Sequence, residues 1–155
     1  MTVAEISIVV PAFNEAAVLA SLADRLRGVL SGIGVAYEVL IVNDGSSDGT
    51  EACLEAMSRD DRRIRPVNLA RNFGKEAAMA AGLASAAGNC IVFIDADLQH
   101  PPDLIPRMYA AWRQGSDVVN AVKRQRASES VVYRWFANRF NGLMSTVIGR
   151  NMAGA

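Results

Sequence analysis

Short apolar runs, rich in β-branched residues, alternate along the chain with longer segments of helical spacing. The run at 6–10 is too short for a helix and is followed by Pro11, which is typical of a strand buried on both faces. Similar runs predict further strands at 39–42, 64–69, 91–94 and 117–122, and helical spacing predicts helices at 15–30, 48–59, 75–87 and 104–114. Strands that alternate with helices of this length predict an α/β, Rossmann-like fold with a mainly parallel sheet and helices on both faces. Asp48 and Glu51 have the spacing of a helix-capping pair.

Length and composition favour a single globular domain. With 155 residues, half of them apolar and about a fifth charged, the chain can bury one core, and disorder or a disulfide scaffold is excluded. Cys53 and Cys90 have no metal or redox spacing, so we expect buried thiols in a reducing compartment. No segment has the pattern of a signal peptide or the length of a membrane span, so the chain as given is expected not to be an integral membrane protein.

Charge is unevenly distributed although the formal net charge is zero. Residues 1–106 hold eight basic and fourteen acidic side chains, whereas residues 107–155 hold eight basic and two acidic ones. A basic last third is compatible with a phosphate-bearing or anionic partner and equally with ordinary solvated side chains. Nothing in the pattern requires nucleic acid.

Polar residues follow each of the first four predicted strands. In open α/β sheets, ligands bind beyond the carboxyl ends of the strands, so four polar segments should meet at one rim. They bring carboxylates, amides, a lysine and an arginine together, and they are P-A-F-N-E at 11–15, N-D-G-S-S-D at 43–48, R-N-F-G-K at 71–75 and D-A-D-L-Q-H at 95–100.

Asp95 and Asp97 are the candidate metal ligands at this rim. Two apart in an extended chain, their side chains point the same way and repel unless a cation joins them. Mg²⁺ or Mn²⁺ prefers such oxygen ligands and leaves positions for substrate phosphates, and Gln99 or His100 could extend the shell. The alternative is that Asp95 caps the turn and Asp97 is solvated, because a D-x-D pattern often occurs by chance.

Other rim residues also have a functional and a structural interpretation. Asp44 could accept a hydrogen bond from a base or a ribose hydroxyl, or could simply form a turn beside Gly45. Arg71 and Lys75 flank Gly74 and could receive a diphosphate, or could be solvated at a helix start. His100 precedes a proline and fits a structural role better than that of a general base.

Two common nucleotide-binding patterns are absent from the sequence. The first strand is not followed by G-x-G-x-x-G, which argues against a dinucleotide-binding domain, and no G-x-x-x-x-G-K-[ST] occurs. No nucleophile elbow is present either. The remaining interpretation is a metal-assisted nucleotide site built from acidic residues.

Together these motifs closely resemble glycosyltransferase family 2, whose fold is the GT-A nucleotide-sugar domain. The resemblance covers residues 6–149 and is carried by V-V-P-A-F-N-E at 9–15, I-V-N-D-G-S-S-D-G-T at 41–50, R-N-F-G-K-E at 71–76 and D-A-D-L-Q-H-P-P at 95–102. The last two are most similar to the polyprenyl-phosphate branch, which includes dolichol-phosphate mannose synthase and the bactoprenol glucosyltransferases.

The resemblance implies roles for individual residues. It places Asp95 and Asp97 at the catalytic centre, with Asp97 and Gln99 as ligands of Mg²⁺ or Mn²⁺. It implies that the acceptor phosphate meets Lys123, where the family usually has an arginine, and Arg134; lysine keeps the charge but loses the bidentate fork. The expected donor-binding residues are Pro11, Ala12, Phe13, Glu15, Val42, Asp44, Arg71, Gly74, Lys75, Asp95 and Ala96.

The implied reaction is an inverting sugar transfer from a nucleotide-sugar, with UDP the expected nucleotide, to a polyprenyl phosphate in cell-envelope glycan synthesis. The lipid phosphate oxygen would attack the anomeric carbon while metal and cations stabilise the departing diphosphate. The expected location is the cytoplasmic face of the membrane, and a homo-oligomer is left open. A non-catalytic nucleotide-sugar-binding fragment is the main alternative, and a sugar-nucleotidyltransferase is a weaker one.

The last segment has a helical apolar stripe from 131 to 148, with Arg134 and Arg139 mostly opposite it. Trp135 and Phe136 beside arginines suit a helix at a membrane interface, and packing on the domain core is the alternative. We therefore expect a nucleotide-sugar-binding domain over 1–127 and an amphipathic, juxtamembrane-type helix with a truncated tail over 128–155. If the chain is a fragment, it would bind donor but transfer sugar poorly.

Overall fold

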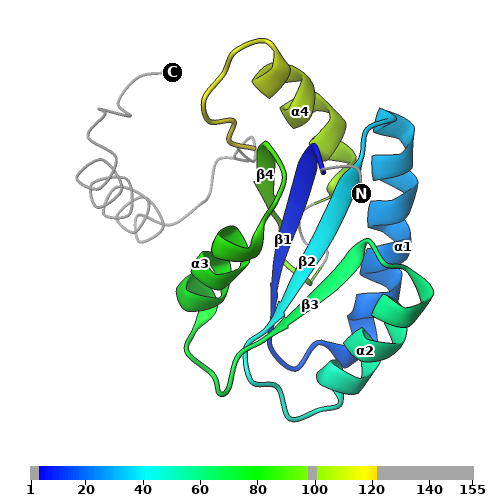
Figure 1. Cartoon of the computed structure of the whole chain (residues 1–155), viewed down its shortest axis with the longest axis vertical. Helices are drawn as coiled ribbons and strands as arrows, with labels where there is room; N and C mark the ends of the chain where they lie inside the picture. The colour runs from blue at the N-terminus through cyan, green and yellow to red at the C-terminus, as the bar shows by residue number, and fades with distance from the viewer. Residues whose placement is uncertain (1–3, 98–100, 122–155) are drawn as a thin grey trace, which may run out of the picture. The chain divides into compact units, whose positions relative to one another are not determined.

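The computed structural model describes residues 4–97 and 101–121, and within them the chain forms a parallel sheet. The strand order is β3-β2-β1-β4, and every neighbouring pair is parallel (Figure 1). The predicted mainly parallel sheet is therefore confirmed. The strands are β1 (Ile6–Ala12), β2 (Tyr37–Asn43), β3 (Ile64–Asn68) and β4 (Cys90–Phe93).

Helices cover both faces of this sheet, as predicted. Helix α3 packs on one face against β1 and β2, and α1 and α2 lie on the other (Figure 1). Helix α4 packs beside α1 and β4. The helical elements are α1 (Ala16–Ile33), α2 (Thr50–Asp60), α3 (Lys75–Ser85), the 3-10 turn η1 (Pro102–Leu104) and α4 (Ile105–Arg113).

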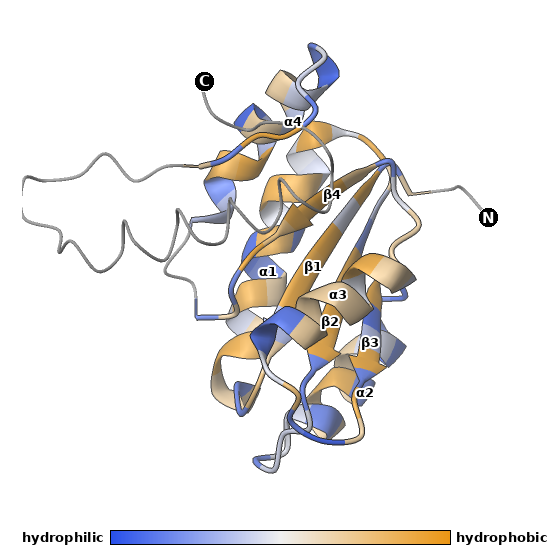
Figure 2. Ribbon diagram, turned by 90° about the vertical axis from the view of Figure 1, so that its left-hand side faces the viewer, coloured by the Kyte–Doolittle hydropathy of each residue, from blue (hydrophilic) through white to orange (hydrophobic). Residues whose placement is uncertain are grey.

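The core is divided by the sheet into two layers, because successive side chains of a strand point to opposite faces. Ile8 and Val10 of β1 face the layer formed with α1, whereas Val9 faces the layer under α3. All three are fully buried, and the strands are strongly hydrophobic in Figure 2. Gly82 of α3 lies directly over Val9, so that a Cβ atom there would lie 2.3 Å from the Val9 Cγ1 atom. The missing side chain lets α3 approach the sheet closely.

Carboxylates at the two ends of β2 hold the segments on either side of α3. At the strand start, the buried Glu38 accepts hydrogen bonds from the Ser7 hydroxyl (2.6 Å) and the Ala87 amide (2.7 Å), and it pairs with Arg65. Burial raises the pKa of Glu38, but the hydrogen bonds from Ser7, Ala87 and Arg65 together outweigh burial and lower it overall. Directly after the strand, Asp44 binds the segment that precedes α3.

Two details of the sequence prediction are wrong. No strand forms over 117–121, the described part of the predicted strand at 117–122, and Val118 is 58% exposed. An extended apolar segment becomes a strand only when another strand pairs with it, and the pattern does not supply that partner. Helix α2 begins at Thr50, and Asp48 and Glu51 do not form a capping box.

Asp48 instead joins two helices. Its carboxylate accepts hydrogen bonds from the Thr50 amide (3.0 Å) and hydroxyl (2.6 Å) and from the Ala16 amide at the start of α1 (3.2 Å). The hydrogen bond from the Thr50 hydroxyl is the main reason why the pKa of Asp48 is lowered. The loop after β2 thus caps the helix after β1, which fixes the two loops to each other.

The predicted domain boundary between 127 and 128 and the amphipathic segment at 131–148 lie outside the described residues. In the described ranges, no helix has both the length and the apolarity that a membrane crossing requires. Both cysteines are free thiols; Cys90 is buried as predicted, and Cys53 is only partly buried.

Candidate functional site

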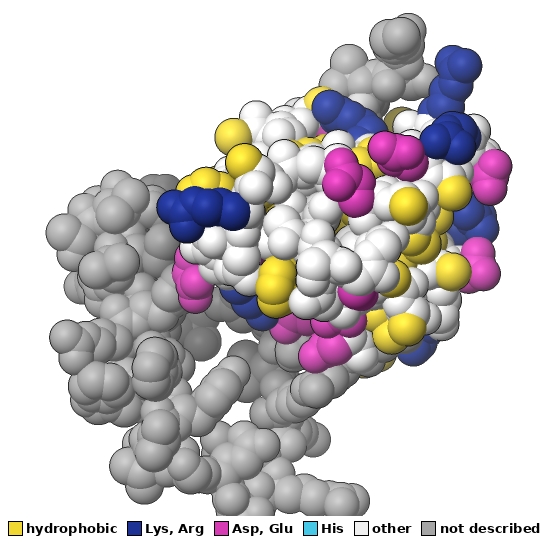
Figure 3. Space-filling view, turned by 90° about the horizontal axis from the view of Figure 1, so that it is seen from below, with side chains coloured by type: hydrophobic (Ala, Val, Ile, Leu, Met, Phe, Trp, Pro, Cys, Tyr) yellow, Lys and Arg dark blue, Asp and Glu magenta, His cyan; other side chains and the backbone are white. Residues whose placement is uncertain are grey.

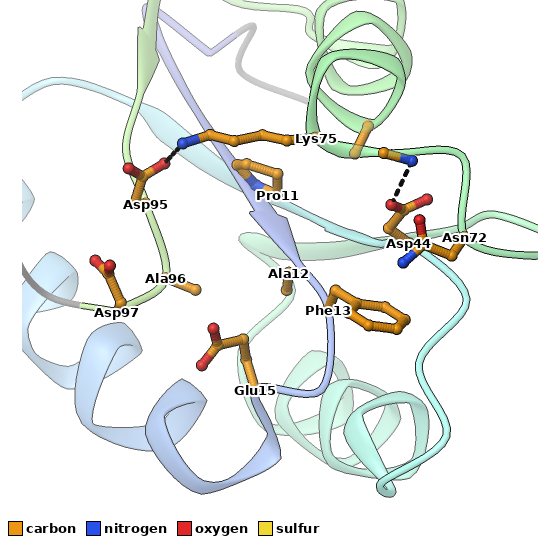
Figure 4. A pocket seen from close by; sticks show the side chains of 12 residues that line it. Pro11, Ala12, Phe13, Glu15, Asp44, Asn72, Lys75, Asp95, Ala96 and Asp97 are labelled. Atoms are coloured by element: carbon orange, nitrogen blue, oxygen red, sulfur yellow. Dashed lines mark hydrogen bonds and ion pairs between the residues drawn. The ribbon is translucent and has the colours of Figure 1, made fainter. Parts of the chain in front are cut away.

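A pocket of about 320 Å³ lies at the carboxyl ends of β1, β2 and β4, where the sequence predicted a rim of polar residues (Figure 4). Each strand end and the start of α3 contribute to it. Figure 3 views the molecule from this end and shows acidic side chains exposed there. The pocket is lined by Pro11, Ala12, Phe13, Glu15, Asp44, Asn72, Gly74, Lys75, Ala78, Asp95, Ala96 and Asp97.

The turn after β1 is held in place by the loop after β2. Asn14 adopts a positive φ of 57°, and its side-chain oxygen accepts a hydrogen bond from the Ser47 amide at 2.9 Å. The Glu15 amide donates to the Thr50 hydroxyl at 3.1 Å. Asparagine tolerates this left-handed conformation better than most residues. Phe13 and Glu15, on either side of Asn14, are thereby fixed beside the pocket.

Asp44 connects β2 to the start of α3. One of its carboxylate oxygens accepts from the Phe73 amide (2.8 Å) and the other from the Gly74 amide (2.9 Å), and the residue is only 3% exposed. These two amides belong to the turn just before α3, where backbone donors lack helical partners. Asp44 therefore positions the 71–74 segment in addition to lining the pocket.

Gly45 allows this segment to approach the loop after β2. Its φ is 67°, and a Cβ atom there would lie 2.4 Å from the backbone carbonyl carbon of Arg71. No other residue type fits both the conformation and the space. The close approach brings the backbone that precedes Lys75 to the edge of the pocket.

Lys75 and Asp95 form an ion pair across the pocket. The Lys75 Nζ atom lies 2.5 Å from Asp95 Oδ1, and the two side chains are 53% and 30% exposed. Figure 4 shows the lysine stem extending from α3 toward the carboxylate that follows β4. Ile94 continues the pairing of β4 with β1, because its amide donates to the Val9 carbonyl at 3.1 Å. Asp95 is thus anchored one residue beyond that hydrogen bond.

Asp95 and Asp97 both line the pocket, so the expected donor-site carboxylate and the expected metal ligand share one space. Their oxygens are the donor type that Mg²⁺ and Mn²⁺ prefer, and one or two protein carboxylates are enough when phosphates and water complete the shell. Among the described residues, no cluster of three His, Cys, Asp or Glu side chains forms a metal site. The donor set therefore fits a divalent ion shared with a ligand. Gln99 and His100 lie outside the described residues.

The pocket lining is strongly acidic. Of the charged residues that line it in the described ranges, Glu15, Asp44, Asp95 and Asp97 are acids, and Lys75 is the single cation. A diphosphate carries negative charge, so this lining alone would repel it. For the described part of the lining to bind such a group, a further cation must lie beside the acids.

Most of the expected donor residues lie in the pocket, and two do not. Val42 is fully buried in the core beneath it. Arg71 does not line the pocket; its guanidinium lies 4.3 Å from the centroid of the exposed Phe73 ring. Lys123 and Arg134, the expected acceptor residues, lie outside the described residues. The sequence interpretation missed Asn72 and Ala78, although Asn72 belongs to the R-N-F-G-K motif that it singled out.

Comparison with known proteins gives a consistent family. A family model described as Glycosyl transferase family 2 matches residues 7–153. The chain is 45% identical over 146 residues to an uncharacterized glycosyltransferase of Synechocystis sp.. The aligned region covers 94% of this chain and 45% of that protein. It is 36% identical to the undecaprenyl-phosphate 4-deoxy-4-formamido-L-arabinose transferase of Edwardsiella ictaluri, over 98% of this chain and 47% of that protein.

Solved structures agree on the fold. Glucosyl-3-phosphoglycerate synthase of Mycobacterium tuberculosis in complex with UDP is 27% identical with a TM-score of 0.65, covering 89% of this chain and 51% of that one. The complex of the same enzyme with Mn²⁺, UDP and phosphoglyceric acid has 28% identity and a TM-score of 0.59, over 74% of this chain and 41% of that one. The chain spans about half the length of the curated relatives it matches.

Proposed function

Because the chain belongs to glycosyl transferase family 2, we propose that its pocket binds the nucleoside diphosphate of a nucleotide-sugar together with a divalent ion, and that the whole protein transfers the sugar to a polyprenyl phosphate. The observation that carries this proposal is the meeting of Asp95, Asp97 and Lys75 in one pocket beyond the carboxyl ends of parallel strands. This is where α/β sheets bind nucleotides.

The residues after β1 and β2 would hold the nucleoside. Pro11 and Phe13 offer apolar surface for a base, and Glu15 offers an acceptor for hydroxyl groups. Asp44 would accept from the base or ribose while keeping its two backbone bonds, because a carboxylate has about four acceptor positions. A UDP-linked donor is supported by the likeness to the synthase solved with UDP, at 27% identity.

Asp97 would hold Mg²⁺ or Mn²⁺, with Asp95 lining the donor side and Gln99 as the further expected ligand. When bound, the ion supplies positive charge that offsets the diphosphate leaving group. The described part of the lining supports this assignment, because its four acids outnumber its one lysine and would repel a diphosphate without a further cation. Lys75 adds the second positive charge from the start of α3.

A polyprenyl phosphate acceptor is supported by the Edwardsiella ictaluri relative, whose name specifies undecaprenyl phosphate. An ionised phosphate oxygen attacks the anomeric carbon with inversion, the bond to the diphosphate breaks, and the nucleoside diphosphate leaves with that electron pair. The phosphate is already a nucleophile, so no side chain has to remove a proton. Lys123 and Arg134 would bind this phosphate at the cytoplasmic face of the membrane.

The first test is binding of UDP and Mn²⁺ by calorimetry. The wild-type protein should bind UDP only with Mn²⁺ present, and Asp97→Ala should abolish this binding while circular dichroism shows an intact fold. Asp24→Ala is the matched control, because Asp24 is an exposed acid on α1 that does not line the pocket. Unchanged UDP binding by Asp97→Ala would contradict the site assignment.

A turnover assay tests the rest of the proposal. UDP-sugars labelled in the sugar are incubated with Mn²⁺ and a polyprenyl phosphate, and the labelled lipid is extracted and counted. Transfer that depends on both the lipid phosphate and Asp97 supports the enzyme; donor binding without transfer supports the non-catalytic alternative.

A further inference from the structure

Lys75 is placed where a lysine is locally unfavourable. It is the first residue of α3, and the amino end of a helix carries partial positive charge that disfavours a cation. A negatively charged side chain is favoured at such a position, and the next residue, Glu76, supplies one in the same first turn. The Lys75 side chain reaches across the pocket to Asp95, and this ion pair offsets the unfavourable position.

The backbone at Lys75 is held rigidly, whereas the ammonium group of its side chain can move. The turn before it is fixed by the two backbone hydrogen bonds to Asp44 and by the close approach at Gly45. The Lys75 side chain itself is half exposed and rotates about four single bonds. Its ammonium group can thus leave Asp95 and reach another anion in the pocket without any movement of the backbone.

We propose that Lys75 is an exchangeable counter-ion, which is paired with Asp95 in the free protein and with the diphosphate in the donor complex. The proposal rests on the function proposed above and adds a coupling to it. While Lys75 holds Asp95, it opposes a divalent ion that approaches the same pair of carboxylates. When the diphosphate attracts Lys75, that opposition ends.

Because of this exchange, donor binding should raise the affinity for the metal, and metal binding should raise the affinity for the donor. A ligand that removes a competing cation from an acidic site raises the affinity of the site for the metal, and by thermodynamic linkage the metal raises the affinity for the ligand by the same factor. The free protein would then bind Mn²⁺ weakly, and the metal and donor would enter together. Lys75 acts here as a positioning residue that also contacts the substrate.

Removing the charge of Lys75 should raise the affinity for Mn²⁺ alone and lower the affinity for UDP. Partly exposed ion pairs are weak, so in Lys75→Met the affinity for Mn²⁺ alone should rise by about two- to fivefold. The affinity for UDP at saturating Mn²⁺ should fall by about ten- to a hundredfold, as is typical for loss of a hydrogen bond to a charged group. A residue that only supported the fold would weaken both.

The experiment measures Mn²⁺ binding without nucleotide from the paramagnetic resonance signal of the free ion, and UDP binding at saturating Mn²⁺ by calorimetry. Arg107→Met is the control for lost net charge, because Arg107 is exposed on α4 and does not line the pocket. Lys75→Gln repeats the test with a polar side chain. Because Lys75 is half exposed, both variants should fold as the wild type does.

The outcomes separate this inference from the proposed function. Opposite shifts in both Lys75 variants, absent from Arg107→Met, support the exchange. If the wild type binds UDP with Mn²⁺ but the Lys75 variants bind Mn²⁺ alone as Arg107→Met does, or more weakly, the exchange is wrong and the proposed function stands. If the wild type binds neither UDP nor Mn²⁺, both are overturned.

Discussion

Replacing Gly82 by alanine tests whether close contact between α3 and the sheet determines the stability of the domain. An alanine Cβ atom at this position would lie 2.3 Å from Val9 Cγ1 and 3.0 Å from Val42 Cγ2. Both valines are fully buried strand residues with little freedom to change rotamer. Helix α3 must therefore move away from the sheet to admit one methyl group.

The expected free-energy change follows from two opposing effects. Alanine is favoured over glycine inside a helix by about 1 kcal/mol. Overpacking a buried site costs about 1–3 kcal/mol, and an overlap of this size belongs in the upper half of that range. Gly82→Ala should therefore lower the free energy of unfolding by about 1–2 kcal/mol. Gly28→Ala is the matched control on α1, because no atom lies within 4 Å of its added Cβ; it should raise the free energy of unfolding by about 0.5–1 kcal/mol.

Urea unfolding followed by circular dichroism measures both variants under the same conditions. The prediction is a lower midpoint for Gly82→Ala and a higher midpoint for Gly28→Ala, with similar slopes. UDP binding by Gly82→Ala should also weaken, because α3 carries Lys75 into the pocket. The reasoning is refuted if both alanines stabilise the protein equally, since helix propensity alone would then account for the data.

Three further variants probe individual contacts. The hydrogen bond from Arg63 is the main cause that lowers the pKa of Asp61 from 3.8 to about 2, and the Asp61 side chain is only 14% exposed. The stabilisation that this carboxylate contributes is complete above pH 3.8 and is lost as the pH falls toward 2. Asp61→Asn should therefore lower the free energy of unfolding at pH 7 by up to about 2 kcal/mol. It should also make the free energy of unfolding depend less on pH between 3.8 and 2, as acid titrations at fixed urea would show. Asp44→Asn keeps one acceptor oxygen for the two backbone amides, so thermal melting should show a loss of about 1–3 kcal/mol, and unchanged stability would contradict the positioning role. Gly45→Ala should weaken UDP binding through its clash with the Arg71 backbone, as calorimetry on the folded variant would show, and an unaltered affinity would mean that the two loops can separate freely.

The sheet and the rim were predictable because both depend on local pattern and general topology. Strand β1 is buried on both faces, so its sequence is continuously apolar and hard to mistake. Parallel strands bring their carboxyl ends to one edge, so the sequence alone predicts that Asp44 and Asp95 lie close together. The two residues indeed line one pocket.

Features that depend on distances between separate segments were not predictable. The ion pair of Lys75 and Asp95 joins residues from two different elements, and no periodicity encodes its 2.5 Å separation. The sequence predicts Arg71 in the pocket, but its guanidinium lies over the Phe73 ring. A long side chain can contact several neighbouring surfaces, and the sequence does not show which contact is most stable. The predicted strand at 117–122 does not form over its described part. A strand needs a neighbouring strand to pair with, and only the tertiary structure can supply it.

The two carboxylates at the ends of β2 fix the positions of the segments before and after α3 relative to that strand. Glu38 holds the amide of Ala87 behind the helix, and Asp44 holds the turn in front of it. An inserted residue would lengthen α3 by about 1.5 Å and rotate its first side chain by about 100° relative to its last. One of the two anchors would then have to break, or Lys75 would point out of the pocket. The length of α3 is therefore part of the chemistry of the site, and loops elsewhere should tolerate insertions that this helix does not.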